Sequence, residues 1–165
     1  MNLYNLHTNP EELHGFDIVP YKRPKLAYEI ALGNPKMRQK LEPTIMKDSY
    51  LAYVYVRDIL KRRWPEAEPY IMKRPYWAYS YAEHVLERPW PEAEPYIMTD
   101  LESIYFYALH VLKHPWPEAE PYIMKDPRYA YWYDRDILKR PWLEAEPYIK
   151  KDPYSWKNYK IWFKL

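Results

Sequence analysis

Paired glutamates are the first residues of this sequence that could do chemistry. Glu66 and Glu68 stand two residues apart, and three later stretches repeat the pair: Glu92 and Glu94, Glu118 and Glu120, Glu144 and Glu146. Two carboxyl groups that face each other can serve as a general acid and a general base. Residues two apart on a helix diverge by about 160°, however, so such a pair cannot flank one scissile bond. The spacing instead predicts an acidic ladder that faces three arginines of the loops, Arg62, Arg88 and Arg140.

His110 and His114 are a second candidate, because residues four apart share one face of a helix and could supply half of a metal site. No glutamate completes a His-Glu pattern beside them, and His114 stands where sister stretches carry arginine. The sequence has only two glycines, Gly15 and Gly33, so it holds no glycine-rich phosphate loop. No serine lies in a nucleophile elbow either. We therefore expect no enzymatic activity, no bound metal and no cofactor.

Composition narrows the class of partner. The 165 residues carry 25 lysines and arginines against 23 aspartates and glutamates, a net charge of +2. This balance gives no strong attraction to nucleic acid or to an anionic membrane. The absence of cysteine rules out disulfides, and the sequence shows no secretory signal and no membrane-spanning run. We expect a cytoplasmic protein with no membrane partner.

Basic clusters in the N-terminal half leave one alternative open. Together with neighbouring tyrosines they could follow a phosphate backbone and stack bases, which would make this half a nucleic-acid or nucleotide-binding surface. Acidic residues in the same segments and the near-neutral total weigh against it. The residues of this alternative are Lys22, Arg23, Lys36, Arg38, Lys61, Arg62 and Arg63.

An internal repeat must position all of these residues. Four tryptophans, Trp64, Trp90, Trp116 and Trp142, lie 26 residues apart, and a fixed period of this kind is typical of stacked repeat arrays. The spacing predicts five two-helix repeats over residues 22–46, 47–72, 73–98, 99–124 and 125–150. Residues 1–21 match the period poorly and are expected to form an N-terminal cap. Residues 151–165 are expected to form a C-terminal capping half-repeat.

Each repeat is expected to contain a longer and a shorter helix. The longer one starts at Asp-Pro, as at Asp126 and Pro127, because aspartate caps a helix N-terminus and proline suits its first position. Apolar residues then recur at helical spacing for about 13 residues. The shorter helix follows the tryptophan, and Pro69 either bends it or separates a turn from a fresh helix. We favour the single bent helix.

The repeat unit also resembles a known pattern. Its core, Trp-Pro-Glu-Ala-Glu-Pro followed by Tyr-Ile-Met, is similar to short tandem two-helix repeats in hypothetical proteins of bacteria and their phages, over residues 22–165. The resemblance implies a helical repeat fold and brings no activity, catalytic residue or ligand with it. The period and the resemblance lead to the same expectation, an all-α protein built as an α-solenoid of stacked two-helix repeats.

The longer helices supply the candidate binding surface. Two tyrosines per helix, such as Tyr53 and Tyr55, are expected to divide between the core and the next repeat. On the opposite face packing would keep side chains polar, yet apolar and aromatic residues stand there beside arginines, as is typical of protein interfaces. We expect a non-enzymatic scaffold that binds a protein partner through this face. By analogy with phage proteins, it is expected to be a modulator or inhibitor of a host protein. The predicted protein-binding residues are Tyr76, Phe106, Leu109, Arg128, Trp132 and Arg135.

Overall fold

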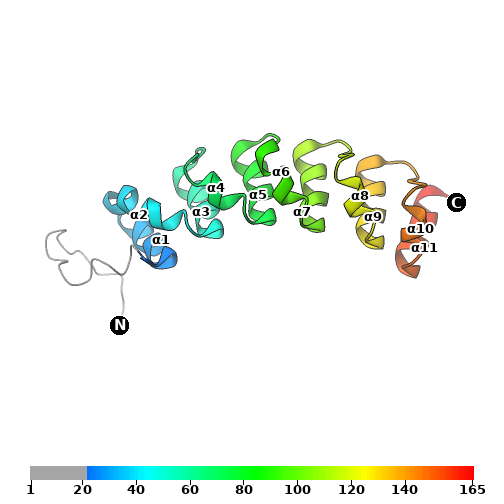
Figure 1. The fold of residues 1–165 in the computed structure, drawn as a ribbon, viewed down its shortest axis with the longest axis horizontal. Coiled ribbons are helices and arrows are strands. Elements are labelled where there is room, and N and C mark those ends of the chain that lie inside the picture. Colours follow the sequence, from blue (N-terminus) through cyan, green and yellow to red (C-terminus); the bar gives the residue numbers. More distant parts are fainter. Residues whose placement is uncertain (1–21) are drawn as a thin grey trace. The chain divides into compact units, whose positions relative to one another are not determined.

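The computed structural model describes residues 22–165, and its ordered elements in this range are all helices, with no strand (Figure 1). The expected all-α class is therefore confirmed for the described part of the chain. The N-terminal cap expected at residues 1–21 lies outside it. The chain forms two compact units, Met1–Ile71 and Met72–Leu165, and each is described by itself. Within residues 22–165 no helix has both the length and the apolar character needed to cross a bilayer.

The first unit contains four α-helices in its described part. They are α1 (Pro24–Gly33), α2 (Arg38–Ile45), α3 (Ser49–Tyr55) and α4 (Glu68–Ile71). A 3₁₀ turn, Pro35–Met37, leads into α2, and a π-helical segment, Val56–Leu60, continues α3. Helix α1 packs on α2, and α3 packs on α1, α2 and α4.

The second unit alternates longer and shorter helices. The longer helices are α5 (Pro75–Tyr81), α7 (Leu101–Phe106), α9 (Pro127–Tyr133) and α11 (Pro153–Phe163), and the shorter ones are α6 (Glu94–Ile97), α8 (Glu120–Ile123) and α10 (Glu146–Ile149). Each longer helix packs on the next, α5 on α7, α7 on α9 and α9 on α11 (Figure 1). Each shorter helix packs against a longer one, so the helices form packed pairs.

The starts of the longer helices follow the expected capping chemistry. Asp100 accepts a hydrogen bond from the backbone N–H of Ser103 (2.9 Å), and Asp152 accepts one from that of Ser155 (2.8 Å). These bonds satisfy backbone donors that the first turn of a helix leaves free. The same bond is made by Asp48 and Asp126. Proline occupies the first helical position at Pro75, Pro127 and Pro153.

The ends of the longer helices were not expected from the sequence. Four helices, α3, α5, α7 and α9, continue into a π-helical last turn. These turns are Val56–Leu60, Ala82–Leu86, Tyr107–Leu112 and Asp134–Leu138. The residue that follows each segment has a positive φ of 50–61° and is not glycine, a conformation that costs about 1–2 kcal/mol for such residues. These residues are Lys61, Glu87, Lys113 and Lys139. Because π segments are wider than α-helix and frequent at functional sites, the four ends are where a binding surface should be sought.

The expectation of one bent helix around Pro69 was wrong. The chain turns through residues 65–67 and starts a fresh helix at Glu68 that ends at Ile71. In the next repeat the turn is a 3₁₀ helix, Pro91–Ala93. The proline is the second residue of the short helix. A backbone N–H at this position has no acceptor within the helix, so the missing N–H of proline costs no helical hydrogen bond. The residue before the proline is itself α-helical, as at Glu94 with φ −54° and ψ −40°, so the chain changes from turn to helix one residue before that proline.

A buried tyrosine joins successive repeats in the second unit. The Tyr133 hydroxyl accepts a hydrogen bond from the Trp116 N–H (2.6 Å) and donates one to Glu120 Oε1 (3.4 Å). Tyr107 does the same one repeat earlier, with the Trp90 N–H at 2.7 Å. Burial raises the pKa of the Tyr133 hydroxyl, so it stays protonated and can donate. The other tyrosine of the helix, Tyr105, is also buried and contacts the Trp132 ring of the next repeat (centroids 6.0 Å apart), so both tyrosines reach a neighbouring repeat.

We expect Tyr133→Phe to lower the free energy of unfolding by about 1–3 kcal/mol, because it leaves the buried Trp116 N–H without an acceptor. Urea denaturation followed by circular dichroism measures this loss. Tyr154→Phe is the matched control, since Tyr154 is 74% exposed. An unchanged stability of Tyr133→Phe would show that water or another group takes over the bond.

The last full repeat departs from this arrangement. The Trp142 N–H donates to Oδ2 of Asp134 (3.1 Å), which stands where sister repeats carry Val56, Ala82 and Ala108. Asp134 is completely buried, and its Oδ1 has no hydrogen-bond partner. Burial raises its pKa to about 7. A carboxyl group thus occupies a position built for a small apolar side chain.

Candidate binding groove

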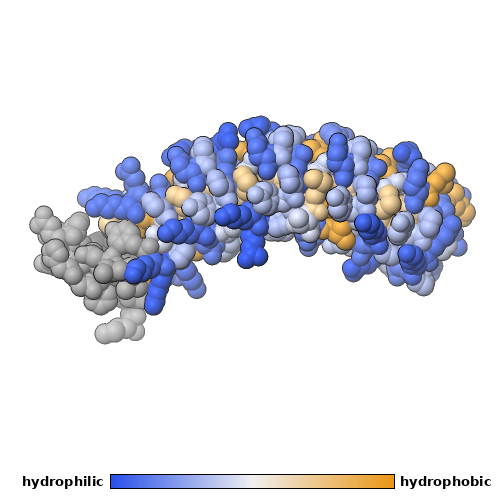
Figure 2. Space-filling view, in the orientation of Figure 1, coloured by the Kyte–Doolittle hydropathy of each residue, from blue (hydrophilic) through white to orange (hydrophobic). Residues whose placement is uncertain are grey.

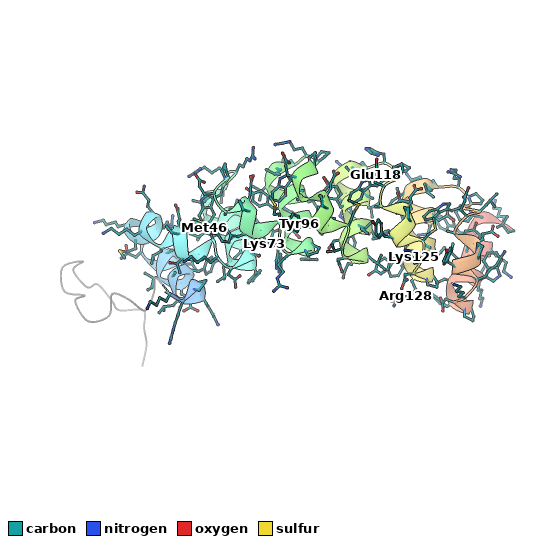
Figure 3. All side chains as sticks on the ribbon, viewed as in Figure 1. Met46, Lys73, Tyr96, Glu118, Lys125 and Arg128 are labelled. Carbon is teal, nitrogen blue, oxygen red and sulfur yellow. The ribbon has the colours of Figure 1, made fainter. Side chains whose placement is uncertain are left out.

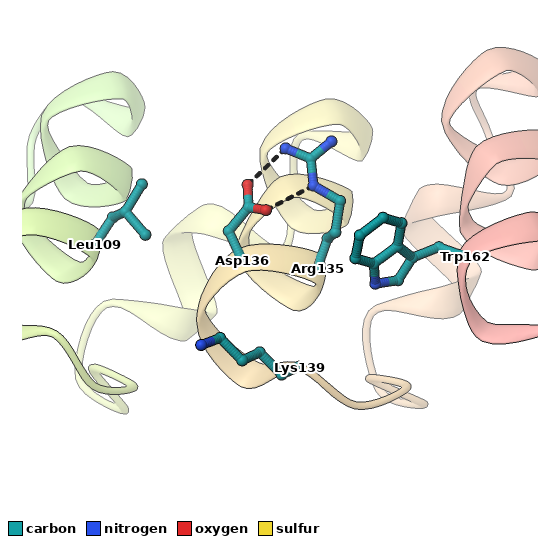
Figure 4. A pocket seen from close by; sticks show the side chains of 5 residues that line it. All are labelled: Leu109, Arg135, Asp136, Lys139 and Trp162. Carbon is teal, nitrogen blue, oxygen red and sulfur yellow. Dashed lines mark hydrogen bonds and ion pairs between the residues drawn. The ribbon is translucent and has the colours of Figure 1, made fainter.

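A surface groove lies in the second unit where the π-helical ends of α7 and α9 meet α11. A depression of about 580 Å³ is lined by Leu109, Arg135, Asp136, Lys139 and Trp162. Figure 4 shows Leu109 and Trp162 on the helices that flank the one carrying the three charged residues. A second depression of about 170 Å³ shares Leu109, Asp136 and Lys139 with the first. It adds Ala108, Lys113 and Ile137, and we treat the two depressions together as the groove.

An ion pair fixes the floor of the groove. Arg135 donates two hydrogen bonds to Asp136, both 2.6 Å long (Figure 4). The guanidinium also lies over the rings of Tyr131 and Trp162, 5.4 and 5.9 Å from their centroids. Asp136 accepts a third hydrogen bond, from the Tyr105 hydroxyl at 2.6 Å. Although burial alone would raise the pKa of Asp136, the hydrogen bonds from Arg135 and Tyr105 lower it, so this carboxylate is ionised.

Two lysines border the groove. Lys113 and Lys139 follow the π segments of α7 and α9, and both are exposed. Their left-handed backbone conformation ends each helix and carries the side chain to the rim of the groove. Arg135 is balanced by Asp136, so the lysines leave an excess of positive charge. The groove is therefore basic in a chain that is nearly neutral.

Apolar surface completes the groove. Leu109 is half-buried, and the Trp162 side chain is 57% exposed. Other apolar side chains are exposed as well, Tyr154 and Ile161 on α11 and Leu165 just after it. Figure 2 shows hydrophobic surface at the place of the C-terminus in Figure 1 and further hydrophobic spots between helices of the second unit. Indole, guanidinium and aliphatic surface thus stand side by side.

The six predicted protein-binding residues have different surroundings in the second unit. Leu109 and Arg135 line the groove. Phe106 stacks on the Tyr79 ring of the preceding repeat, 5.9 Å away at 18° between planes, and is half-buried. Trp132 is half-buried against Tyr105 in the same way. These two rings fill joints between repeats, because each faces a tyrosine of the helix before it.

The other two predicted residues, Tyr76 and Arg128, are exposed but lie in the first turns of α5 and α9. Arg128 lies 3.7 Å from Asp126, next to the start of its helix. In Figure 3, Arg128 and Lys125 are near the lower edge of the second unit, whereas Glu118, in the turn that follows a π segment, is near the upper edge. Because the groove is built at the π-helical ends, Arg128 takes no part in it.

Several groove residues were not predicted from the sequence, namely Asp136, Lys139, Lys113 and Trp162, and Trp162 is the one with a signal in the sequence. It stands 26 residues after Asp136, at the position that holds Asp58, His84 and His110 in other repeats. A tryptophan at a position that is otherwise polar signals exposed apolar surface. An alignment of residues 151–165 with the full repeats reveals this tryptophan, whereas the expectation of a C-terminal cap does not.

The cations of the nucleic-acid alternative lie in the first unit, and two of them are used by the fold. Arg38 donates to the carbonyl oxygen of Ala31 (3.0 Å), and Arg63 makes two hydrogen bonds to Glu68, at 2.6 and 2.8 Å. Glu68 is therefore paired with Arg63 and not with Arg62, the expected partner. All of these cations except the half-buried Arg38 are exposed, including Arg63, whose side chain is 50% exposed.

The histidines of the predicted half metal site have different partners. His110 Nδ1 lies 3.1 Å from Glu83 Oε1, whereas His114 Nδ1 lies 2.7 Å from the carbonyl oxygen of Pro115. His84 also approaches Glu83, at 3.6 Å. Within residues 22–165 no group of three or more histidine, aspartate or glutamate side chains is placed to hold a metal ion.

Comparisons with known proteins give no relative from which a function could be transferred. A scan against protein-family models found no match, and neither did searches of curated proteins and of solved structures. The groove is therefore interpreted from its own residues.

Proposed function

We propose that this chain is a non-enzymatic scaffold, an α-solenoid of stacked two-helix repeats, that binds a protein partner through the exposed ends of its longer helices. The observation that carries the proposal is the groove, where the exposed Trp162 indole lies beside Arg135 and Leu109. Tryptophan and arginine are the residues most enriched among those that dominate interface energies. A partner side chain that covers the indole would remove apolar surface from water at about 25 cal/mol per Å².

The chemistry of the groove favours binding over catalysis. Asp136 is its one carboxylate, and three hydrogen bonds from Arg135 and Tyr105 occupy it. A carboxylate with a lowered pKa that is held in this way is a poor general base. Burial also raises the pKa of the Tyr105 hydroxyl, so it remains a donor to Asp136 and not a base. The groove offers contact surface and fixed charge.

The resemblance to repeats of phage proteins fits this role. A small scaffold without catalytic groups would act by occupying or redirecting a host protein in the cytoplasm. Nucleic-acid binding by the first unit has less support, because Arg38 and Arg63 are engaged in contacts within that unit.

Capture of partners from a bacterial lysate by the immobilised chain tests the proposal. We expect Trp162→Ala and Leu109→Ser each to lower capture of the specific partner by about tenfold or more, as removal of a central contact does. Leu143→Ala is the control, because Leu143 is 68% exposed and lies outside the groove. Capture that is equal for all three variants, with melting temperatures unchanged, would reject the groove as the binding site.

A further inference from the structure

We infer that the groove takes an acidic peptide segment in which carboxylates alternate with a large apolar side chain. This inference rests on the proposed function and specifies the chemistry of the partner. Its basis is the juxtaposition of two rim lysines, Lys113 and Lys139, with the apolar surface of Leu109 and Trp162.

The charges of the groove select for carboxylates. Asp136 is neutralised by Arg135, so the charge left for a ligand is that of Lys113 and Lys139. Both lysines border the same depression, which also contains Leu109. Burying a ligand carboxylate next to them is favourable because opposite charges attract more strongly where water is displaced. A basic segment would meet repulsion at the same place.

The apolar wall selects against a purely acidic ligand. Trp162 is 57% exposed although its neighbour Arg135 lies over its ring. A leucine or aromatic side chain placed on the indole would bury apolar area on both partners. Carboxylates alone would leave this surface in water, so the best ligand combines both kinds of side chain.

Comparison with the repeat of α5 shows that not every repeat carries this positive charge, although Arg57, Asp58 and Lys61 of the first unit match Arg135, Asp136 and Lys139. Two repeats before Arg135 and Lys139, the corresponding residues are Glu83 and Glu87. Glu83 is paired with His110 instead of facing lysines. A carboxylate-rich segment is therefore attracted at the π-helical end of α9 and repelled at that of α5. Within the second unit the charge pattern therefore separates the end of α9 from that of α5.

The size of the groove suits an extended segment. It runs from the π-helical end of α7, past that of α9, to α11, which is two helix spacings of about 8–10 Å each. An extended chain advances about 3.3 Å per residue, so roughly five or six residues span it. Because the depression is open along its length, a peptide can enter from the side without a lid.

The test uses the full chain and fluorescein-labelled peptides in an anisotropy titration. The probe is a decapeptide of glutamates alternating with leucine and phenylalanine. One comparison peptide keeps the glutamates and replaces the apolar residues by glycine, and another keeps the apolar residues and replaces the glutamates by lysine. We expect the probe to bind at least about tenfold more tightly than either comparison peptide, and its affinity to fall with added salt because the contact is partly ionic.

Charge-reversal variants locate the site. Lys139→Glu and Lys113→Glu are each expected to weaken probe binding by about tenfold. Lys125→Glu makes the same change of net charge outside the groove, at an exposed lysine between α8 and α9, and is expected to leave the affinity unchanged. Equal weakening by all three variants, or no binding of the probe, would overturn the inference. Tighter binding of the lysine peptide would overturn it as well.

Failure of this inference can be told apart from failure of the proposed function. If Trp162→Ala abolishes partner capture but Lys139→Glu does not, the groove binds a protein whose contact segment is not acidic. If Trp162→Ala and Leu109→Ser leave capture unchanged, the groove is not a binding site at all. Only reduced capture by Trp162→Ala and Lys139→Glu, with normal capture by Lys125→Glu, supports both statements.

Discussion

Asp134→Ala is expected to stabilise the second unit by about 2–4 kcal/mol at pH 8; the upper value corresponds to the rise of the Asp134 pKa from 3.8 to about 7. The carboxyl group is completely buried and its Oδ1 has no partner, so ionisation in the folded state is unfavourable. Alanine already fills the equivalent position at Ala82 and Ala108, which are fully buried too. The Trp142 N–H would not be left unpaired, because Tyr159 stands where Tyr107 and Tyr133 accept that bond in sister repeats.

The gain depends on pH, and its sign follows from the proton balance. Between pH 3.8 and about 7 folded Asp134 retains a proton that the unfolded chain has released. Stability of the wild type therefore falls as the pH rises through this window and is lowest above it. The advantage of Asp134→Ala should be near zero at pH 4 and complete at pH 8.

Denaturant titrations at several pH values measure this effect. Asp136→Ala supplies a comparison of opposite sign, since the pKa of Asp136 is lowered and its loss removes hydrogen bonds from Arg135 and Tyr105. That variant should be less stable than the wild type at pH 8. A variant Asp134→Ala that is less stable than the wild type at pH 8 would show that the carboxylate is stabilised by a contact the structure does not contain.

Trp116→Ala is expected to destabilise the second unit by about 3–5 kcal/mol, the usual cost of truncating a buried tryptophan. Trp116 is only 4% exposed, and its ring lies against Tyr107, with centroids 5.2 Å apart. Its backbone N–H also donates to Tyr133 of the next repeat. The substitution therefore opens a cavity at a joint between two repeats, where no other ring is placed to fill it.

Thermal and urea denaturation measure this loss, with Trp162→Ala as the matched control. Trp162 is 57% exposed, so the same truncation there should change the free energy of unfolding by about 0.5 kcal/mol or less. Similar losses for the two variants would mean that Trp162 contributes to the core and is not primarily a binding residue. A loss below about 1 kcal/mol for Trp116→Ala would contradict the joint described for this repeat.

The sequence predicts the longer helices well because their determinants are local. Asp100 and Asp152 cap their helices as expected, and Pro75 and Pro127 stand at the first positions. The π-helical ends could not be predicted, because their register depends on how Leu and Tyr side chains of neighbouring helices fit together. The choice between a bent helix and a separate turn at Pro69 was also made wrongly, since both conformations suit the same residues.

The candidate site was predicted less well, since exposure depends on the neighbouring repeat. Phe106 and Trp132 look like free aromatic residues in the sequence, but Tyr79 and Tyr105 of the preceding helices cover part of each ring. Leu109, by contrast, lines the groove. Such differences arise from packing distances, which residue types at fixed spacing do not determine.

The joints have a consequence for how the gene can change in length. The Trp90 N–H bonds to a tyrosine 17 residues later, and that tyrosine bonds to a glutamate 13 residues earlier. The next repeat uses the same two separations. Loss or duplication of one 26-residue block by recombination would bring together halves that already match. Copy number can therefore drift without a new core having to evolve.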